Sequence, residues 1–447
     1  MDEVYDVIVL GTGLKECILS GIMSVERKKV LHMDKNDYYG GKSASLNIDQ
    51  MFEHFKKEGE GSKLYGHNRD WNVDLIPKFI MSAGKLVKAL VKTDVTKYLE
   101  FKSVVGSYVY KKNKVHKVPS NGQEALKSKL MGMMEKRRFK NFLQYVQNLY
   151  FKEKKALKKG YDLDKMTMKE LFKKFSLDNN TIDFIGHAMA LHREDSYLER
   201  PARETVDKIN LYINSVSKYG NTPYIYPMYG LGELPQAFAR LSAVYGGTYM
   251  LHKPIEKVHY DNEGRVMGVE SEGETAKCKM VIASPEYFPE KVKVAGQVVR
   301  CICFLDHPIP NCNENESIQL IIPQSEVNRQ HDIYVCSISH AHNVSKEGIW
   351  IAIVSTTVET ENPKEEIKPA LALLGDIKEQ FYSVDDILVP TNNPLEDGVF
   401  ITTGYDATSH FETTMEDVMN VYKSLTGEEL QFKKKETEKK DEKTEKN

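Results

Sequence analysis

The chain has 447 residues, enough for two or three domain-sized cores, and its 41% hydrophobic and 28% charged residues are typical of a soluble globular protein. The net charge of −2 gives no overall field for attracting nucleic acid. The acidic start lacks a secretory signal, no apolar run approaches about 18 residues, and the six cysteines form no C-x-x-C pair. We therefore expect no nucleic-acid partner, no membrane span and no metal site.

The most informative stretch lies near the start of the chain. Residues 5–10 predict a buried parallel strand, Gly11 and Gly13 a tight turn, and the apolar segment after them a helix. A second predicted strand, residues 29–33, ends at Asp34, which is 34 − 13 = 21 residues beyond Gly13. This order is the dinucleotide-binding fingerprint, in which an acid about 20 residues further on binds the ribose hydroxyls.

One position of the fingerprint is altered, because Glu16 occupies the slot of its third glycine. A side chain there separates the helix from the strand, and an anion would repel a pyrophosphate at the helix N-terminus. The alternative is that Glu16 points into solvent and only favours the helix dipole. We predict a Rossmann-type layer that has lost its nucleotide, and no cofactor.

Strand signals are absent from residue 120 to about 218, where four apolar stripes at helical spacing predict an all-helical insertion. Such stripes form either the core of a helical bundle or the wall of a lipid pocket. Residues 127–159 carry eleven basic residues against two acidic ones. This basic run is either a solvated helix face or a surface attracted to anionic lipids.

The rest of the chain is mostly β, with less regular segments. We expect loops over residues 51–70, a helix over 86–99, strands from 248 to about 357, and a last parallel strand near 399–406 followed by a helix. Residues 433–447 are almost entirely Lys, Glu and Thr and predict disorder.

Two further segments contain residues that are candidates for a binding site at the protein surface. Glu233 and Arg240 are seven residues apart on one predicted helix face. They form either a solvent-exposed ion pair, which would contribute little, or a pair that recognises a partner. Tyr39, before two glycines, either packs under its own loop or presents its ring at the surface.

Together these motifs resemble the Rab GDP-dissociation inhibitors, which are related to the Rab escort proteins. The resemblance covers about residues 1–432, and its most specific motifs are residues 5–21, 38–41, 70–78, 224–240, 245–250 and 409–414.

The resemblance implies an α/β fold with an all-helical insertion. Residues 1–119 and 220–432 would form a flavoprotein-like domain I with parallel and mixed sheets, without flavin, and residues 120–219 a small helical domain II. It also implies a Rab-binding platform in domain I, formed by Tyr39, Glu233, Gln236, Arg240, Thr248 and Met250.

The resemblance further implies that Lys218, Thr222 and Tyr224 belong to a loop that contacts the membrane and the Rab C-terminus. Position 218 is commonly arginine in the family, and a lysine lacks the bidentate contact of arginine. Domain II would shelter a geranylgeranyl group. Among its apolar residues we select Phe142, Leu143, Val146, Ile185 and Ile213 as the prenyl pocket.

The expected function is that of a monomeric, cytoplasmic, non-enzymatic regulator. It would bind prenylated GDP-bound Rab GTPases, slow GDP release and carry them between membrane and cytosol in vesicle traffic. The alternatives are a flavin-dependent oxidoreductase of the amine-oxidase type, which would be yellow, and a Rab escort protein, which would also accept unprenylated Rab.

Overall fold

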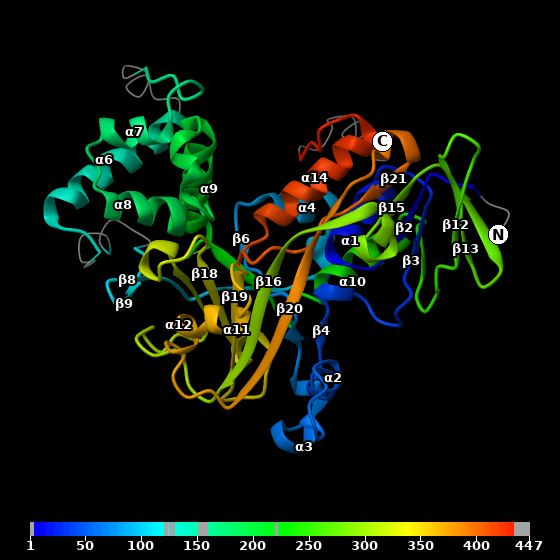
Figure 1. Ribbon diagram of the computed structural model, residues 1–447, viewed down its shortest axis with the longest axis horizontal. Coiled ribbons are helices and arrows are strands. Elements are labelled where there is room, and N and C mark those ends of the chain that lie inside the picture. Colours follow the sequence, from blue (N-terminus) through cyan, green and yellow to red (C-terminus); the bar gives the residue numbers. More distant parts are fainter. Residues whose placement is uncertain (1–3, 120–123, 125–129, 151–159, 220–221, 433–447) are drawn as a thin grey trace, which may run out of the picture.

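A computed structural model describes residues 4–119, 124, 130–150, 160–219 and 222–432 (Figure 1). Strands from the first, middle and last parts of the chain form a five-stranded, all-parallel sheet in the order β11-β3-β2-β15-β21. The strands are β2 (Val7–Leu10), β3 (Val30–Met33), β11 (Thr248–Met250), β15 (Val281–Ala283) and β21 (Val399–Ile401). Helix α1 (Leu14–Val25) connects β2 to β3, so the predicted strand–turn–helix–strand unit is confirmed.

A larger mixed sheet runs in the order β20-β16-β19-β18-β17-β8-β9. Its strands are β8 (Gly106–Lys111), β9 (Lys114–Lys117), β16 (Val292–Leu305), β17 (Ile318–Ile322), β18 (Ile333–Ser339), β19 (Trp350–Thr357) and β20 (Glu379–Pro390). Apart from the parallel pair β17 and β8, neighbouring strands are antiparallel. The long strands β16 and β20 run the length of this part of the molecule (Figure 1).

Three smaller sheets complete the β structure of the described residues. The first contains β1 (Val4–Tyr5), β12 (Lys257–Tyr260), β13 (Val266–Ser271) and β14 (Glu274–Cys278). The second contains β6 (Ile80–Met81), β7 (Phe101–Ser103) and β10 (Tyr224–Pro227), and the third pairs β4 (Ser45–Leu46) with β5 (Val73–Asp74).

The helical insertion contains α6 (Met133–Tyr150), α7 (Met168–Lys174), α8 (Asn179–Asp183), a π-helical turn η5 (Phe184–Met189) and α9 (Ala202–Tyr219). These helices lie together at one end of the molecule, at the left of Figure 1. The predicted stripes face inward, with Phe142, Val146, Ile185 and Ile209 fully buried. The prediction of amphipathic helices here is confirmed.

The remaining helices are associated with the sheets. They are α2 (Ile48–His54), α3 (Gly61–Tyr65), α4 (Lys85–Thr93), α10 (Glu233–Val244), α11 (Pro363–Glu366), α12 (Lys368–Leu371), α13 (Pro394–Asp397) and α14 (Glu412–Thr426). Short 3₁₀ turns include η3 (Val95–Tyr98). The predicted parallel strand β21, followed by helix α14, is confirmed.

Two local predictions are wrong. The stretch 51–70 is not simply loop: it contains most of α2 and all of α3, because Asn47 and Gln50 form a reciprocal capping box that starts α2. The helix expected over 86–99 ends at Thr93, because Asp94 adopts a left-handed conformation, and only a 3₁₀ turn follows. The charged tail, residues 433–447, lies outside the described residues.

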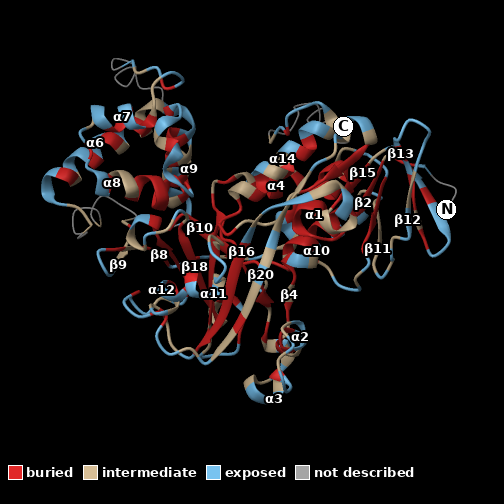
Figure 2. Ribbon diagram, in the orientation of Figure 1, coloured by how far each residue is buried: buried red, intermediate tan, exposed pale blue. Residues whose placement is uncertain are grey.

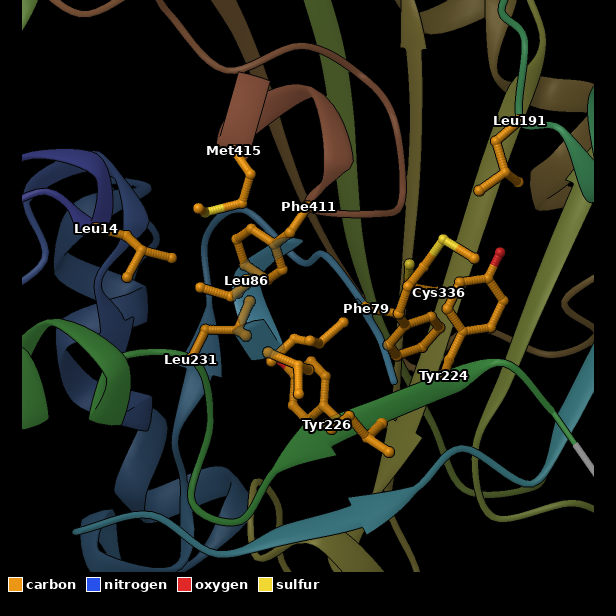
Figure 3. Packing of buried hydrophobic residues seen from close by; sticks show 14 of the residues in the cluster. Leu14, Phe79, Leu86, Leu191, Tyr224, Tyr226, Leu231, Cys336, Phe411 and Met415 are labelled. Carbon is orange, nitrogen blue, oxygen red and sulfur yellow. The ribbon is translucent and has the colours of Figure 1, made fainter. Parts of the chain in front are cut away.

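Buried residues concentrate where the sheets and helices meet (Figure 2). Close to β10, the rings of Tyr224 and Tyr226 pack on Phe79, with centroids 5.9 and 5.6 Å apart (Figure 3). Phe411 and Cys336 belong to the same buried cluster. The strand that leads out of the helical insertion is therefore anchored in the interior of the sheet-containing part. None of the described helices has both the length and the apolar character required to cross a bilayer.

Candidate functional site

The turn between β2 and α1 is where a dinucleotide phosphate would bind in a Rossmann-type layer. The Glu16 side chain is only 2% exposed there, and Thr402 Oγ1 donates a hydrogen bond to Glu16 Oε1 at 2.5 Å. A Cβ atom on Gly13 would collide with the Glu16 carboxylate, so this carboxylate covers the backbone that a pyrophosphate would approach. The alternative, that Glu16 points into solvent, is therefore excluded.

The Glu16 carboxyl group carries less negative charge than the sequence led us to expect. Burial raises the pKa of Glu16 to about 7, although the bond from Thr402 opposes this shift. At neutral pH the carboxyl group is therefore only partly ionised. It blocks the cradle by occupying space as much as by repelling an anion.

The acid of the fingerprint is also engaged. Asp34 is 1% exposed, and its Oδ2 accepts hydrogen bonds at 2.6 Å from both the backbone N–H and the hydroxyl of Thr12. Its Oδ1 accepts from the Asn36 N–H at 2.8 Å and from the Tyr287 hydroxyl at 3.2 Å. Four internal donors therefore use the carboxylate that was expected to bind ribose. With Glu16 on Gly13, the residues present do not fit a bound dinucleotide.

An exposed groove of about 400 Å³ lies over helix α10. Its lining includes Tyr39, Tyr98, Glu233, Gln236, Arg240 and Tyr249, with three alanines of α10 between the polar side chains. We call it the α10 groove. It brings together four residues of the predicted platform, Tyr39, Glu233, Gln236 and Arg240, from segments about two hundred positions apart in the chain.

The crossover unit supports this groove from below. Gly21 of α1 has no side chain, and a Cβ there would lie 2.7 Å from a ring carbon of Phe238 on the buried face of α10. Tyr249 of β11 packs against His32 of β3, with centroids 4.3 Å apart, and donates to Ser20 of α1 at 3.1 Å. Helix α1 and strand β3 of the crossover unit therefore position α10 and β11.

Tyr39 is positioned by the same unit. The Gly40 N–H donates to the Thr12 carbonyl at 3.0 Å and to the Thr12 hydroxyl at 3.2 Å. Because Asp34 holds Thr12, a chain of buried hydrogen bonds runs from the fingerprint acid to the loop that carries Tyr39. The Tyr39 ring is half-buried and lies 6.2 Å from the ring of Tyr249, so it lines the groove.

The two charged groups of the groove do not pair with each other. The Arg240 guanidinium lies 4.5 Å from the centroid of Tyr98 and has no carboxylate partner among the described residues. Glu233 also lacks a hydrogen bond or ion pair to its carboxylate in the described part of the chain, and partial burial raises its pKa. The alternative of an exposed Glu233–Arg240 ion pair is therefore not what the structure shows.

Thr248 and Met250 lie on β11 but not in the groove. Side chains alternate along a strand, and Tyr249 faces α1. Met250 accordingly packs on the opposite side of the sheet, against the cluster that contains Leu31 and Met33. The structure therefore separates these two predicted platform residues from the other four.

Of the three predicted loop residues, only Lys218 is exposed, and its Nζ donates to the Ser82 carbonyl at 3.2 Å. Thr222 is 3% exposed and donates to the Val104 carbonyl at 2.5 Å, and Tyr224 is 1% exposed within β10. Thr222 and Tyr224 therefore belong to the core and not to an exposed loop, while their contact with the membrane and the Rab C-terminus stays a prediction.

The five residues selected for a prenyl pocket lie in the interior of the helical insertion. Phe142, Val146 and Ile185 are fully buried, while Leu143 and Ile213 are partly buried against the same core. The ring of Phe142 packs edge-on to Phe172 and Phe175, at 5.5 and 5.3 Å. In this structure these residues fill a bundle core.

Two groove residues, Tyr98 and Tyr249, were not identified from the sequence. Tyr249 lies between two residues that were selected, and strand alternation is the signal that distinguishes it from them. Tyr98 is the last residue of the 3₁₀ turn η3, far from α10 in the chain, and no local pattern indicated it.

The fold is a Rossmann-type, flavoprotein-like scaffold in which the Glu16 side chain fills the phosphate cradle. The adjacent helix α10 carries an exposed groove lined by tyrosine and arginine. Residues 1–437 match the family model described as GDP dissociation inhibitor, and the chain belongs to this family.

Its relatives cover nearly its whole length. It is 55% identical to the Rab GDP dissociation inhibitor beta of Rattus norvegicus over 99% of both chains. It is 56% identical to guanosine nucleotide diphosphate dissociation inhibitor 2 of Arabidopsis thaliana, over 96% of this chain and 97% of the other. These relatives are named as inhibitors of nucleotide dissociation, that is, as regulators.

Solved structures agree on the fold. The crystal structure of the Rab GDI from Plasmodium falciparum superposes with a TM-score of 0.93 at 47% identity, covering 96% of this chain and all of the other. An oxidoreductase from Methanosarcina mazei has a TM-score of 0.59 at 14% identity, covering 94% of this chain and all of the other. The predicted flavoprotein-like fold is confirmed.

Proposed function

We propose that this protein is a Rab GDP dissociation inhibitor that binds prenylated, GDP-bound Rab GTPases through the α10 groove. The observation that carries the proposal is the convergence of Tyr39, Glu233, Gln236 and Arg240 in one exposed groove. Tyrosine and arginine are the residues most often found as anchors of protein interfaces. Unpaired charges of both signs there can be satisfied by a partner.

Nucleotide selectivity follows from the state of the partner. The switch loops of a GTPase are ordered by the γ-phosphate and released when it is absent. A rigid groove that binds the released loops prefers the GDP form, and holding these loops opposes nucleotide escape. Thr248 and Met250 would take part only if the partner also reached the other side of the β11 edge.

The lipid requires a second part of the molecule, and we propose the division predicted above: a sheet-containing domain I, residues 1–119 and 220–432, and a helical domain II, residues 120–219. A 20-carbon geranylgeranyl chain, at about 0.8 kcal/mol for each buried CH₂, anchors a GTPase to a membrane by on the order of 10 kcal/mol. A carrier must supply comparable apolar surface.

The interior of domain II has that character. Because Phe142, Val146 and Ile185 are fully buried, a lipid can enter only if the helices separate. We propose that Lys218, in the last turn of α9, contacts the C-terminal tail of the GTPase. The protein would then act as a monomer in the cytoplasm and visit membranes transiently.

The testing experiment is a pull-down of purified Rab by the full chain, comparing GDP with GTP forms and prenylated with unprenylated Rab. We expect capture of prenylated GDP-Rab above the other three forms, and release of prenylated GDP-Rab from membranes into solution. Equal capture of unprenylated Rab would instead indicate an escort protein. Equal capture of the GTP form would refute the proposal.

A further inference from the structure

The outer face of helix α6 carries the most exposed large apolar side chains of the described residues. Met133 is 86% exposed and Met134 is 68% exposed, more than any other large hydrophobic residue described. They are adjacent at the first turn of the helix. Exposed apolar groups concentrated at one point of a surface mark a contact with a partner or a membrane.

Basic side chains follow directly on the same face. At 100° per residue, Met133, Arg137 and Lys140 fall within one narrow arc of α6, and Arg137 and Lys140 are exposed. Neither of these two basic groups has an ion-pair partner among the described residues. Met134 lies about 60° beyond this arc and is exposed, whereas Arg138 lies further round towards Glu135, with which it pairs.

The single acid of this turn does not neutralise the surface. Glu135 lies on the buried side, where its Oε1 accepts from the Asp178 N–H at 2.9 Å and its Oε2 from Arg138 at 3.2 Å. The opposite face of α6, with Phe139, Phe142 and Val146, belongs to the bundle core. The methionine and basic face is therefore held outward by the packing of the helix.

We propose that Met133, Met134, Arg137 and Lys140 form a docking surface for an anionic lipid bilayer. Flexible methionines can enter the headgroup region while the long basic side chains remain at the level of the phosphates, which is how interfacial helices bind membranes. The basic charge favours anionic lipid over a neutral bilayer, and a protruding helix end suits a flat surface better than it suits a peptide.

If the proposed function holds, the position of α6 would bring the proposed lipid pocket next to a bilayer bound at this surface. The helix lies at the outer edge of the molecule, well away from α10 in the sheet-containing part, and its outer side is exposed (Figures 1 and 2). The α10 groove stays free while α6 touches the bilayer. Because Phe142 and Val146 line the interior from the same helix, a bilayer in contact with α6 is next to the proposed lipid pocket.

The test is sedimentation of the full chain, without any GTPase, with phosphatidylcholine vesicles that contain or lack phosphatidylserine. Binding should be stronger with phosphatidylserine and fall as salt rises. R137E/K140E should weaken it by about twenty-fivefold or more, at about fivefold for each basic residue lost. M133S/M134S should weaken it by about fivefold or more for each methionine.

Matched controls separate this surface from general charge and hydrophobicity. K257E/K277E makes the same charge change at exposed positions of the sheet that contains β12 and β14, and M267S removes a methionine that is 50% exposed. Both controls should bind vesicles like the unchanged protein. All variants should keep the unfolding transition of the parent and its capture of GDP-Rab in solution.

No preference of the unchanged protein for phosphatidylserine vesicles would overturn the proposal, even if an acidic protein partner were bound at α6. Equal vesicle binding by the α6 variants and the controls would overturn it as well. Failure of the Rab pull-down would refute the proposed function but leave the vesicle result standing, so the two failures are distinguishable.

Discussion

Asp34→Asn tests whether the acid of the fingerprint positions the Tyr39 side of the α10 groove. The carboxylate accepts hydrogen bonds from Thr12 (two), Asn36 and Tyr287, and it is 1% exposed. In asparagine one oxygen becomes an NH₂ group, which faces two donors whichever way the amide is turned. Hydrogen bonds to a buried charged group contribute about 1.5–3 kcal/mol each. Losing two of them should lower the free energy of unfolding by about 3 kcal/mol or more.

The same substitution should weaken Rab binding through Tyr39. Without Asp34, Thr12 no longer fixes the Gly40 N–H, and the Tyr39 ring loses its fixed position. Tyr39→Ala should cost about 1–3 kcal/mol in affinity for GDP-Rab if Tyr39 is an anchor. Asp34→Asn should then cost a similar or smaller amount alone, and almost nothing in a Tyr39→Ala background.

The assays are denaturant unfolding and titration of labelled GDP-Rab, with Asp37→Asn as control. Asp37 is exposed and lies three residues away, so the same chemical change there should leave stability within about 0.5 kcal/mol of the parent. The reasoning is refuted if Asp34→Asn is as stable as the control. It is also refuted if the losses in affinity from Asp34→Asn and Tyr39→Ala simply add.

Three further predictions test other parts of the structure. Arg240→Ala should weaken GDP-Rab binding, measured by titration, by about 1–3 kcal/mol, and a change under about 0.3 kcal/mol would count against a role of Arg240. Tyr98→Leu should weaken binding by about 0.5–1 kcal/mol, with no further loss in the Arg240→Ala background. His187 is buried, but Asp332 and Asp195 raise its pKa to about 10. Because this folded value exceeds the unfolded one near 6.5, the charged pair stabilises fully below about pH 6.5 and its contribution is lost as pH rises through 10. The free energy of unfolding of the parent should therefore fall between pH 7 and 10, and that of His187→Gln should change less over this range. Glu16→Gly should not restore flavin binding, since Asp34 remains engaged, and a purified variant that absorbs near 450 nm would contradict this.

Local sequence patterns were sufficient wherever one segment determines its own structure. The alternating apolar run before Gly11 and the helical stripes of the insertion predicted β2, α1 and α6–α9, because periodicity decides which face of an element is buried. Glu16 in a glycine slot was enough to predict a damaged cradle. By contrast, helix α2 was not predicted, although Asn47 and Gln50 have the residue types and spacing of a capping box.

The sequence by itself determined the Rossmann-type crossover, the helical insertion and, through its motifs, the family. Only the tertiary structure decided that Asp34 holds the Tyr39 loop, that Tyr98 and Tyr249 line the α10 groove, and that Thr222 and Tyr224 lie in the core. The reason is that these facts depend on contacts between segments tens to hundreds of residues apart. Hydrophobic periodicity records whether a side chain is buried, but not which distant side chain it meets.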